Sequence, residues 1–247
     1  MSEIFDRKLL KQNQSRISKQ FSEYNFLYHE IATRIVENLE FYSRDFESCL
    51  EIEARDGYLS SLMQQEKNIK NVQTICDDNL SQFKNESFDL IFSNLNLHHI
   101  NSVPQFLMQI KNLLKPEGIF IASFFGEENL SQLHKTIFEV ENKIYNGISP
   151  RMIPTIDVKT AAMLLQKAGF LNPVSTLERV DVEYENPLKL LKDLKMMGQG
   201  NIMLKRSRKF FTRGFLQQVL QQYHDSYQTN DGKVKATFEI ITIIGSK

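Results

Sequence analysis

The stretch from Ser48 to Ser60 constrains the fold of this chain more than any other part of the sequence. Its first half is a short apolar run typical of a buried strand, and the residues around Gly57 are typical of a tight turn that leads into a helix. In α/β proteins such a turn follows the first strand of a parallel sheet, and free N–H groups at the start of the helix face a bound ligand. The stretch therefore predicts an α/β domain with a ligand site at the carboxyl end of its first strand.

Strand-like and helix-like segments alternate along the chain after this turn. Apolar runs predict strands at 49–53, 71–76, 88–94, 119–125, 174–184 and 235–244. Apolar residues at helical spacing predict helices at 57–65, 103–114, 130–145, 157–168, 187–197 and 206–227. The alternation predicts a mostly parallel, doubly wound sheet with a helical insertion before the last strand.

The sequence before the first strand has a different pattern. Residues 1–45 form a predicted helical lead-in, helical throughout 3–40, and residues 46–247 form the α/β domain with its insertion at 186–230. A lead-in of this kind either covers the mouth of the ligand site or packs as an ordinary helix.

Composition limits the classes of partner. The chain has 30 Lys and Arg and 30 Asp and Glu, so its formal net charge is zero, which argues against a broad nucleic-acid surface. No apolar run reaches the ~18 residues that span a bilayer, so we expect no transmembrane segment. Cys49 and Cys76 fall in strand-like runs, where we expect small core residues in a reducing compartment. We expect a soluble, cytoplasmic bacterial protein.

The turn resembles the S-adenosyl-L-methionine (SAM) motif, in which an acidic and an apolar residue precede Gly-x-Gly-x-Gly. Glu51 stands at the acidic position and Gly57 at the last glycine, whereas Glu53 and Arg55 replace the first two glycines. A carboxylate at position 53 points into the space that glycine leaves for the cofactor, and its charge opposes the SAM carboxylate. The motif is therefore degenerate. Residual SAM binding and a solvated acid in a relaxed loop both stay open.

Polar residues at other strand ends are further candidates. Asp77 and Asp78 follow the second strand and could hold an adenine amino group or a substrate amine, although they also suit a turn. Asn94 could orient a substrate amide or guanidinium, or simply cap its strand. The candidate catalytic residues are Asn94 and His98, and the candidate cofactor-binding residues are Glu51, Glu53, Gly57, Asp77, Asp78 and Ser93.

No metal site is predicted. His98 and His99 are adjacent, so their side chains point in different directions, and no carboxylate follows at His-x-Asp/Glu spacing. His98 is either a general base or a packed histidine below the site.

Several longer stretches carry a resemblance to one family. They are Ile4-Phe5-Asp6-Arg7, Ser87–Asn94, Leu97–Asn101, Leu114–Gly118, Asp193–Gly198 and Ala236–Ile241. Together they resemble the methyltransferase homologues that include the mitochondrial complex I assembly factor described as a protein arginine hydroxylase, with its alphaproteobacterial relatives. A looser resemblance is to the malonyl-acyl-carrier-protein methyltransferase of biotin synthesis. The resemblance implies a class I SAM-dependent methyltransferase-like (Rossmann-like) fold, SAM as the cofactor, and a protein substrate or respiratory-complex subunit as the partner.

One departure from the family affects the expected fold. Only one strand fits between Gln65 and Asp77, so we expect a sheet that is one strand short and lacks the second strand with its ribose-binding carboxylate. Two functions stay open. The chain is either an enzyme, a methyltransferase or a modifier of an arginine in complex I assembly, or a non-catalytic assembly partner that keeps the pocket as a remnant of the fold.

Overall fold

The computed structural model describes residues 3–207 and 212–247. Within these ranges, six strands form one mixed sheet in the order β2-β1-β3-β4-β6-β5. The strands are β1 (Phe46–Ile52), β2 (Ile69–Ile75), β3 (Phe88–Ser93), β4 (Leu114–Phe125), β5 (Leu171–Tyr184) and β6 (Val234–Ser246). β1 to β4 are parallel, and β6 runs antiparallel between β4 and β5. This is the predicted doubly wound sheet.

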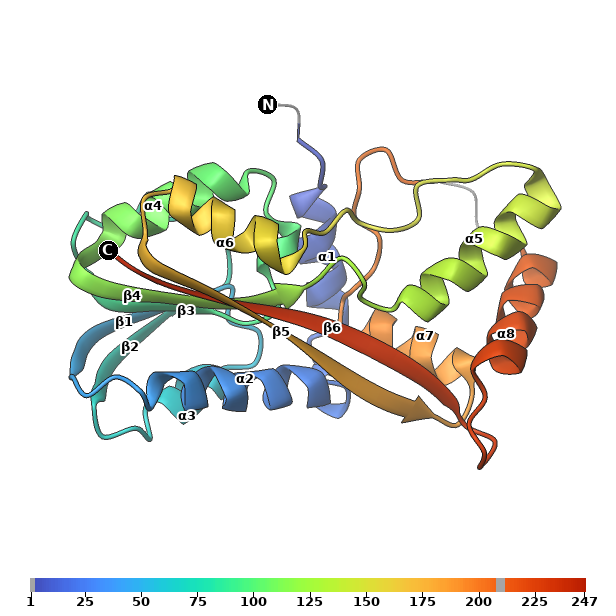
Figure 1. Cartoon of the computed structure of the whole chain (residues 1–247), viewed down its shortest axis with the longest axis horizontal. Coiled ribbons are helices and arrows are strands. Elements are labelled where there is room, and N and C mark those ends of the chain that lie inside the picture. Colours follow the sequence, from blue (N-terminus) through green and yellow to red (C-terminus); the bar gives the residue numbers. More distant parts are fainter. Residues whose placement is uncertain (1–2, 208–211) are drawn as a thin grey trace.

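Helices cover both faces of the sheet (Figure 1). α4 (Val103–Leu113) and α6 (Val158–Lys167) lie on one face, and α2 (Phe26–Leu39) and α3 (Tyr58–Met63) lie on the other. Asp157 caps α6 as a short polar side chain can, because its Oδ1 accepts a hydrogen bond from the N–H of Thr160 at 2.6 Å. Buried apolar residues fill the space on each side of the sheet, so the core has two layers.

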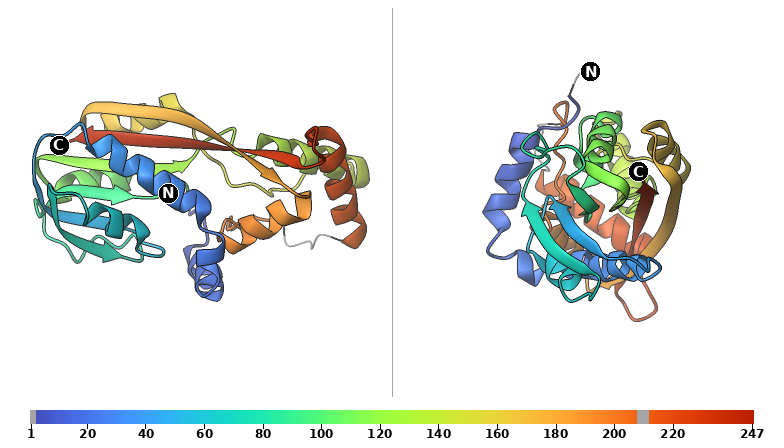
Figure 2. Two further views of the ribbon diagram at one scale, coloured as in Figure 1. Left: turned by 90° about the horizontal axis from the view of Figure 1, so that it is seen from below. Right: turned by 90° about the vertical axis from the view of Figure 1, so that its left-hand side faces the viewer.

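The lead-in is not one continuous helix, and the prediction of helix throughout 3–40 is wrong. α1 (Arg7–Ile17) begins at an Asp6 cap, a short 3₁₀ turn (Phe21–Glu23) follows, and α2 begins after Asn25. The side chain of Asp6 accepts the N–H of Leu9, which fixes the start of α1. The break lets α1 leave the face that α2 covers and cross the ends of the strands (Figure 2).

A second group of helices lies beyond the end of the parallel strands, where β5 and β6 extend past them (Figure 1). It consists of α5 (Ser131–Tyr145), α7 (Pro187–Met196) and α8 (Arg213–Tyr227). α7 and α8 are the predicted insertion. The predicted helix 206–227 begins only at Arg213 in the described part, and residues 208–211 lie outside the described residues.

The strand order also shows which strand is absent. β2 pairs directly with β1 along its whole length, so it takes the place of the second strand, and the absent strand is the outer one. The expectation that the second strand is missing is therefore wrong. An apolar run shows that a strand exists but not which neighbour it pairs with. Asp77 and Asp78 follow the strand beside β1, where a ribose-binding acid lies in doubly wound folds.

The two cysteines differ in exposure. Cys49 is buried as expected, but Cys76 is exposed, because it follows the end of an edge strand rather than lying within it. Among the described residues, none of the helices is both long and apolar enough to cross a bilayer.

Candidate functional site

The turn after β1 keeps the backbone path of a glycine-rich turn although its first glycine is replaced. Glu53 has φ of 58° and Gly57 has φ of 74°, both in the left-handed region. Non-glycine residues rarely adopt this region, so Glu53 takes on the conformation that glycine would supply. Its side chain is nevertheless buried rather than solvated.

The carboxylate of Glu53 is neutralised by Arg7, the first residue of α1. The two side chains form a buried ion pair, and Nη2 of the same guanidinium lies 3.2 Å from Oδ1 of Asp78. Nη1 donates a hydrogen bond to the backbone carbonyl of His99 at 3.3 Å. Burial lowers the pKa of Arg7, and the charges of Asp78 and Asp77 oppose that shift. Arginine stays protonated in proteins, so the turn carries a charged pair.

The other two charged residues of the turn also have partners in the lead-in. The guanidinium of Arg55 lies 4.3 Å from the ring centroid of Phe21, and its Nη1 donates to the carbonyl of Met197 at 3.2 Å. Asp56 accepts a hydrogen bond from Nδ2 of Asn25 at 2.7 Å and lies 2.9 Å from Nε2 of His29. The pKa of Asp56 is lowered because these hydrogen bonds and that of the Tyr58 N–H outweigh burial.

Glu51 and Ser93 are placed inside the fold at the strand ends. The hydroxyl of Ser60 donates to the carboxyl of Glu51, and burial raises the pKa of Glu51 to about 7. The hydroxyl of Ser93 donates to the carbonyl of Ile52 at 3.1 Å. Both side chains therefore tie β1 to its neighbours in this structure.

The side chains of Asn94 and Asp77 also have partners within the chain. Nδ2 of Asn94 donates to the carbonyl of Tyr28 at 2.8 Å, and its Oδ1 accepts from the hydroxyl of Ser123 at 3.1 Å. Oδ2 of Asp77 lies 3.3 Å from Nζ of Lys11 on α1. Asn94 thus links α2 to β4, and Asp77 is a second acid that α1 neutralises.

His98 belongs to a hydrogen-bonded chain between the sheet and the insertion. Its Nδ1 accepts from the N–H of Phe125 at 3.4 Å, so its Nε2 carries the proton and donates to Oε1 of Gln199 at 3.1 Å. Nε2 of Gln199 donates in turn to the hydroxyl of Tyr28 at 2.8 Å. Burial lowers the pKa of His98 to about 4, so the imidazole is neutral near pH 7.

The neighbouring histidine is also buried. Neither ring nitrogen of His99 has a hydrogen-bond partner among the described residues, and burial lowers its pKa well below the usual value. Within the part of the chain that the structure describes, no three His, Cys, Asp or Glu side chains are grouped as metal ligands.

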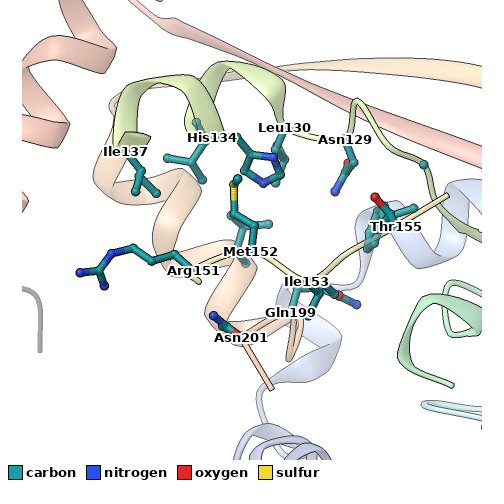
Figure 3. Close-up of a pocket in the computed structure, with 15 residues that line it drawn as sticks. Asn129, Leu130, His134, Ile137, Arg151, Met152, Ile153, Thr155, Gln199 and Asn201 are labelled. Atoms are coloured by element: carbon teal, nitrogen blue, oxygen red, sulfur yellow. The ribbon is translucent and has the colours of Figure 1, made fainter. Parts of the chain in front are cut away.

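A small cleft opens at the carboxyl end of β4 (Figure 3). We call it the acceptor cleft. It has a volume of about 140 Å³, and its walls are the segment 125–137, the loop 151–155 and, within the insertion, residues 194–201 at and after the end of α7. Figure 3 shows His134 of α5 lying toward Met152 of the loop, with the side chain of Arg151 turned away. Burial lowers the pKa of His134 to about 4, so this imidazole is neutral too.

Sequence reasoning did not select these cleft residues. The signal that could have found them is the spacing of Leu130, Leu133, His134 and Ile137, which places one face of α5 toward the cleft. The loop 151–155 has no periodicity, so its place opposite α5 depends on tertiary contacts. A buried ion pair between Arg151 and Glu141 of α5 holds the loop.

A second cavity lies between α1 and the turn. It has a volume of about 350 Å³ and is lined by residues of the lead-in and of the strand ends, among them Lys11, Gln14, Ser18, Phe21, Glu53, Arg55 and Cys76. It lies where a doubly wound sheet binds a nucleotide.

The sheet order, the antiparallel strand beside the edge and the cavity beside the first turn define a class I SAM-dependent methyltransferase fold. Solved structures of that class share it. A candidate methyltransferase from Bacillus halodurans gives a TM-score of 0.55 at 14% identity, covering 87% of this chain and 98% of that one. Phosphoethanolamine N-methyltransferase 2 of Haemonchus contortus, in complex with SAM, gives 0.53 at 15% identity, covering 93% of this chain and 57% of that one. Likeness at such identity shows the fold alone.

Sequence comparison is more specific. Residues 31–122 match the profile of the methyltransferase domain family. A Rickettsia prowazekii protein named as a candidate methyltransferase is 32% identical over 73% of this chain and 87% of its own length. The mouse mitochondrial arginine-hydroxylase NDUFAF5 is 29% identical over 99% of this chain and 77% of its own length. The malonyl-[acyl-carrier protein] O-methyltransferase of Halorhodospira halophila is 24% identical over 97% of this chain and 88% of its own length. The chain belongs to the family of methyltransferase homologues that contains the Rickettsia protein and NDUFAF5.

The residues at the turn fit SAM only in part. Asp77 and Asp78 stand at the position of a ribose-binding acid, but Lys11 and Arg7 already neutralise them. The middle glycine of such a turn lets the backbone approach the ligand, and Arg55 stands there. Glu53 holds a buried charge where the charged end of the cofactor would lie. As arranged here, the turn does not fit the amino-acid end of SAM.

Proposed function

We propose that this chain acts on a protein partner in the assembly of respiratory complex I, and that the acceptor cleft receives a side chain of that partner. The relative named arginine-hydroxylase NDUFAF5 supports a protein substrate, because its similarity extends over 99% of this chain. An arginine of a complex I subunit is the side chain that this relationship favours.

The size of the cleft carries the proposal. At about 140 Å³ it is well below the roughly 300–1,000 Å³ of sites that enclose a free small molecule. It has room for one side chain of a larger partner. Its walls are mostly apolar, with the neutral imidazole of His134 among them, so a side chain with an aliphatic stem would be held along its length. The cleft also lies at the strand ends, the edge where doubly wound sheets bind their ligands.

A non-catalytic role is the second candidate. The buried Glu53–Arg7 pair favours it, because the cofactor turn is neutralised from within the chain. In this case the cleft would hold the partner during assembly, and no bond of the partner would change.

Binding and mass measurements test the proposal and separate these roles. Arginine-containing peptides of complex I subunits are titrated into the full chain by calorimetry, then incubated with SAM, or with ferrous iron and an excess of ascorbate as reductant in air, and weighed by mass spectrometry. A gain of one methylene supports methyl transfer, and a gain of one oxygen that a chelator abolishes supports hydroxylation. A bound peptide of unchanged mass supports the non-catalytic role, and no binding of any peptide contradicts the proposal.

Two methionines provide a matched pair of variants for the binding measurement. Met152 lines the cleft and Met163 lies on α6, and their exposed fractions are 41% and 44%. Met152→Asp places a charge in the cleft and is expected to weaken peptide binding at least about tenfold, a loss of about 1.4 kcal/mol. Met163→Asp is expected to leave binding unchanged. Equal effects of the two variants would place the binding surface elsewhere.

A further inference from the structure

The lead-in makes a specific set of contacts with the turn after β1. Arg7 pairs with Glu53, the ring of Phe21 lies under Arg55, and Asn25 donates to Asp56. Every charged side chain of the turn thus has a partner within residues 7–29, from three successive elements of the lead-in.

The contact around Arg7 has the features of a binding site for a guanidinium group. Two carboxylates, those of Glu53 and Asp78, lie beside Nη2, and the carbonyl of His99 accepts from Nη1. A carboxylate as buried as that of Glu53 is costly to hold without a partner of opposite charge. Arg7 supplies that partner, with Nζ of Lys11 beside the third acid, Asp77.

A second set of contacts holds the residues just before α1, from the loop that precedes α4 and from the insertion. Oδ1 of Asn101 accepts the backbone N–H groups of Ile4 and Phe5 at 2.8 and 2.7 Å, and the N–H of Asp6 donates to the carbonyl of Ile202 at 2.8 Å. These bonds set the start of α1, and Asp6 caps it, so Arg7 is aimed at the turn by backbone contacts as well as by charge.

We propose that residues 7–29 are a built-in ligand of this turn, pairing its charged side chains in the native chain and excluding the amino-acid end of SAM, while the cavity of about 350 Å³ stays open beside it. In a glycine-rich turn, backbone N–H groups and open space receive the charged end of the cofactor. Here Glu53 fills that space, and the chain supplies the compensating cation itself. Entry of the amino-acid end of SAM would require the pair to separate and leave Glu53 buried without a partner. This inference concerns the turn alone and does not depend on the acceptor cleft.

A double-mutant cycle tests the pairing in the full chain. Arg7→Met and Glu53→Gln are made singly and together, and urea unfolding is followed for each. Arg7→Met leaves the buried carboxylate of Glu53 without a partner and is expected to lower the unfolding midpoint most. Glu53→Gln leaves Arg7 beside Asp78 and is expected to lower the midpoint less. The double change is expected to recover most of the loss caused by Arg7→Met. Lys11→Met with Asp77→Asn removes a more exposed pair that joins the same helix to the loop after β2, and this control is expected to show little coupling. Additive losses for Arg7 and Glu53 would overturn the proposal.

Calorimetric titration with SAM tests the closure. The native chain is expected to show no binding heat and no rise in Tm at millimolar SAM, since a native-state ligand would raise Tm. The variant with both Glu53→Gly and Arg7→Met is titrated beside it, and a Tm rise in that variant alone would support closure by this pair. A clear Tm rise for the native chain would overturn the proposal. Peptide binding at the acceptor cleft is measured separately, so either proposal can fail without the other.

Discussion

The carboxyl of Glu51 is a single residue whose environment should appear in the stability of the whole chain. Its pKa is raised from 4.5 to about 7, chiefly by burial. The folded chain then keeps a proton that the unfolded chain loses as pH rises from about 4.5 to 7. Deprotonation opposes folding in that window, so the contribution of Glu51 to stability falls as pH rises.

Replacing Glu51 with glutamine is therefore expected to stabilise the folded chain most at high pH. Glu51→Gln keeps the shape and removes the ionisation, so its stability relative to the native chain should rise by about 2 kcal/mol between pH 5 and pH 8. Urea unfolding at the two pH values measures the change. The exposed Glu40, changed to Gln, is the control. A relative stability that does not vary with pH would show that Glu51 is not buried as a neutral acid.

At the scale of residues, the position of the turn could be predicted from the sequence, but the partners of its charged side chains could not. Glu51, Glu53 and Gly57 lie at the end of β1 as expected, and the left-handed backbone at Glu53 follows from the motif. The pairing with Arg7 could not be read from the motif, because it depends on the path of α1, and that path is set by contacts with Asn101 and Ile202. The conflict between Glu53 and the SAM carboxylate stays a prediction, and in the structure the carboxylate of Glu53 pairs with Arg7 of the lead-in.

At the scale of elements, the end of α7 is held against α1 and the turn by a glycine. Gly198 has φ of 79°, and an added Cβ would lie 3.3 Å from Cδ1 of Ile17 and 3.5 Å from Nη2 of Arg55. Gly198→Ala is expected to destabilise the chain by about 1–2 kcal/mol, from the left-handed backbone and the close contact. Thermal unfolding measures the loss.

The control for this prediction lies in the other helix of the insertion. Gly214 lies in the first turn of α8, and an added Cβ there would meet nothing within 4 Å. Gly214→Ala is expected to be neutral or to stabilise the chain by up to about 1 kcal/mol, because alanine favours helix. Losses of similar size for the two variants would mean that the docking of α7 does not depend on Gly198.

The elements themselves were largely predictable, and their arrangement was only partly so. The strands and helices of the sheet lie within a few residues of the predicted ranges, because their apolar periodicities are strong. The break between α1 and α2 was missed, since apolar spacing continues across it. The place of β2 was misjudged because strand order depends on crossover connections that an apolar run does not encode.

At the scale of the whole molecule, the buried His98 and His99 and the half-buried His134 should reduce stability in acid. Burial lowers the pKa of His98 and His134 to about 4 and lowers that of His99 well below its usual value. The unfolded chain takes up protons below about pH 6.5 that the folded chain refuses. The contribution of these histidines to the free energy of unfolding is therefore fully present above that pH and is lost as pH falls toward 4. Glu51 acts in the opposite direction over part of this window, but it is one group against three.

His134 is the histidine best suited to test this balance, because no hydrogen bond ties its ring within the described residues. The native chain is expected to lose stability between pH 7 and pH 5. His134→Asn is expected to make that loss smaller by about 2 kcal/mol, because the pKa of His134 is lowered from 6.5 to about 4. Urea unfolding at pH 5, 6 and 7 measures the slope. His224 lies on α8 with its side chain 37% exposed, and His224→Asn should leave the slope unchanged. An unaltered slope in the His134 variant would mean that folding does not lower the pKa of this imidazole, so the ring would take up its proton over the same pH range in the folded and the unfolded chain.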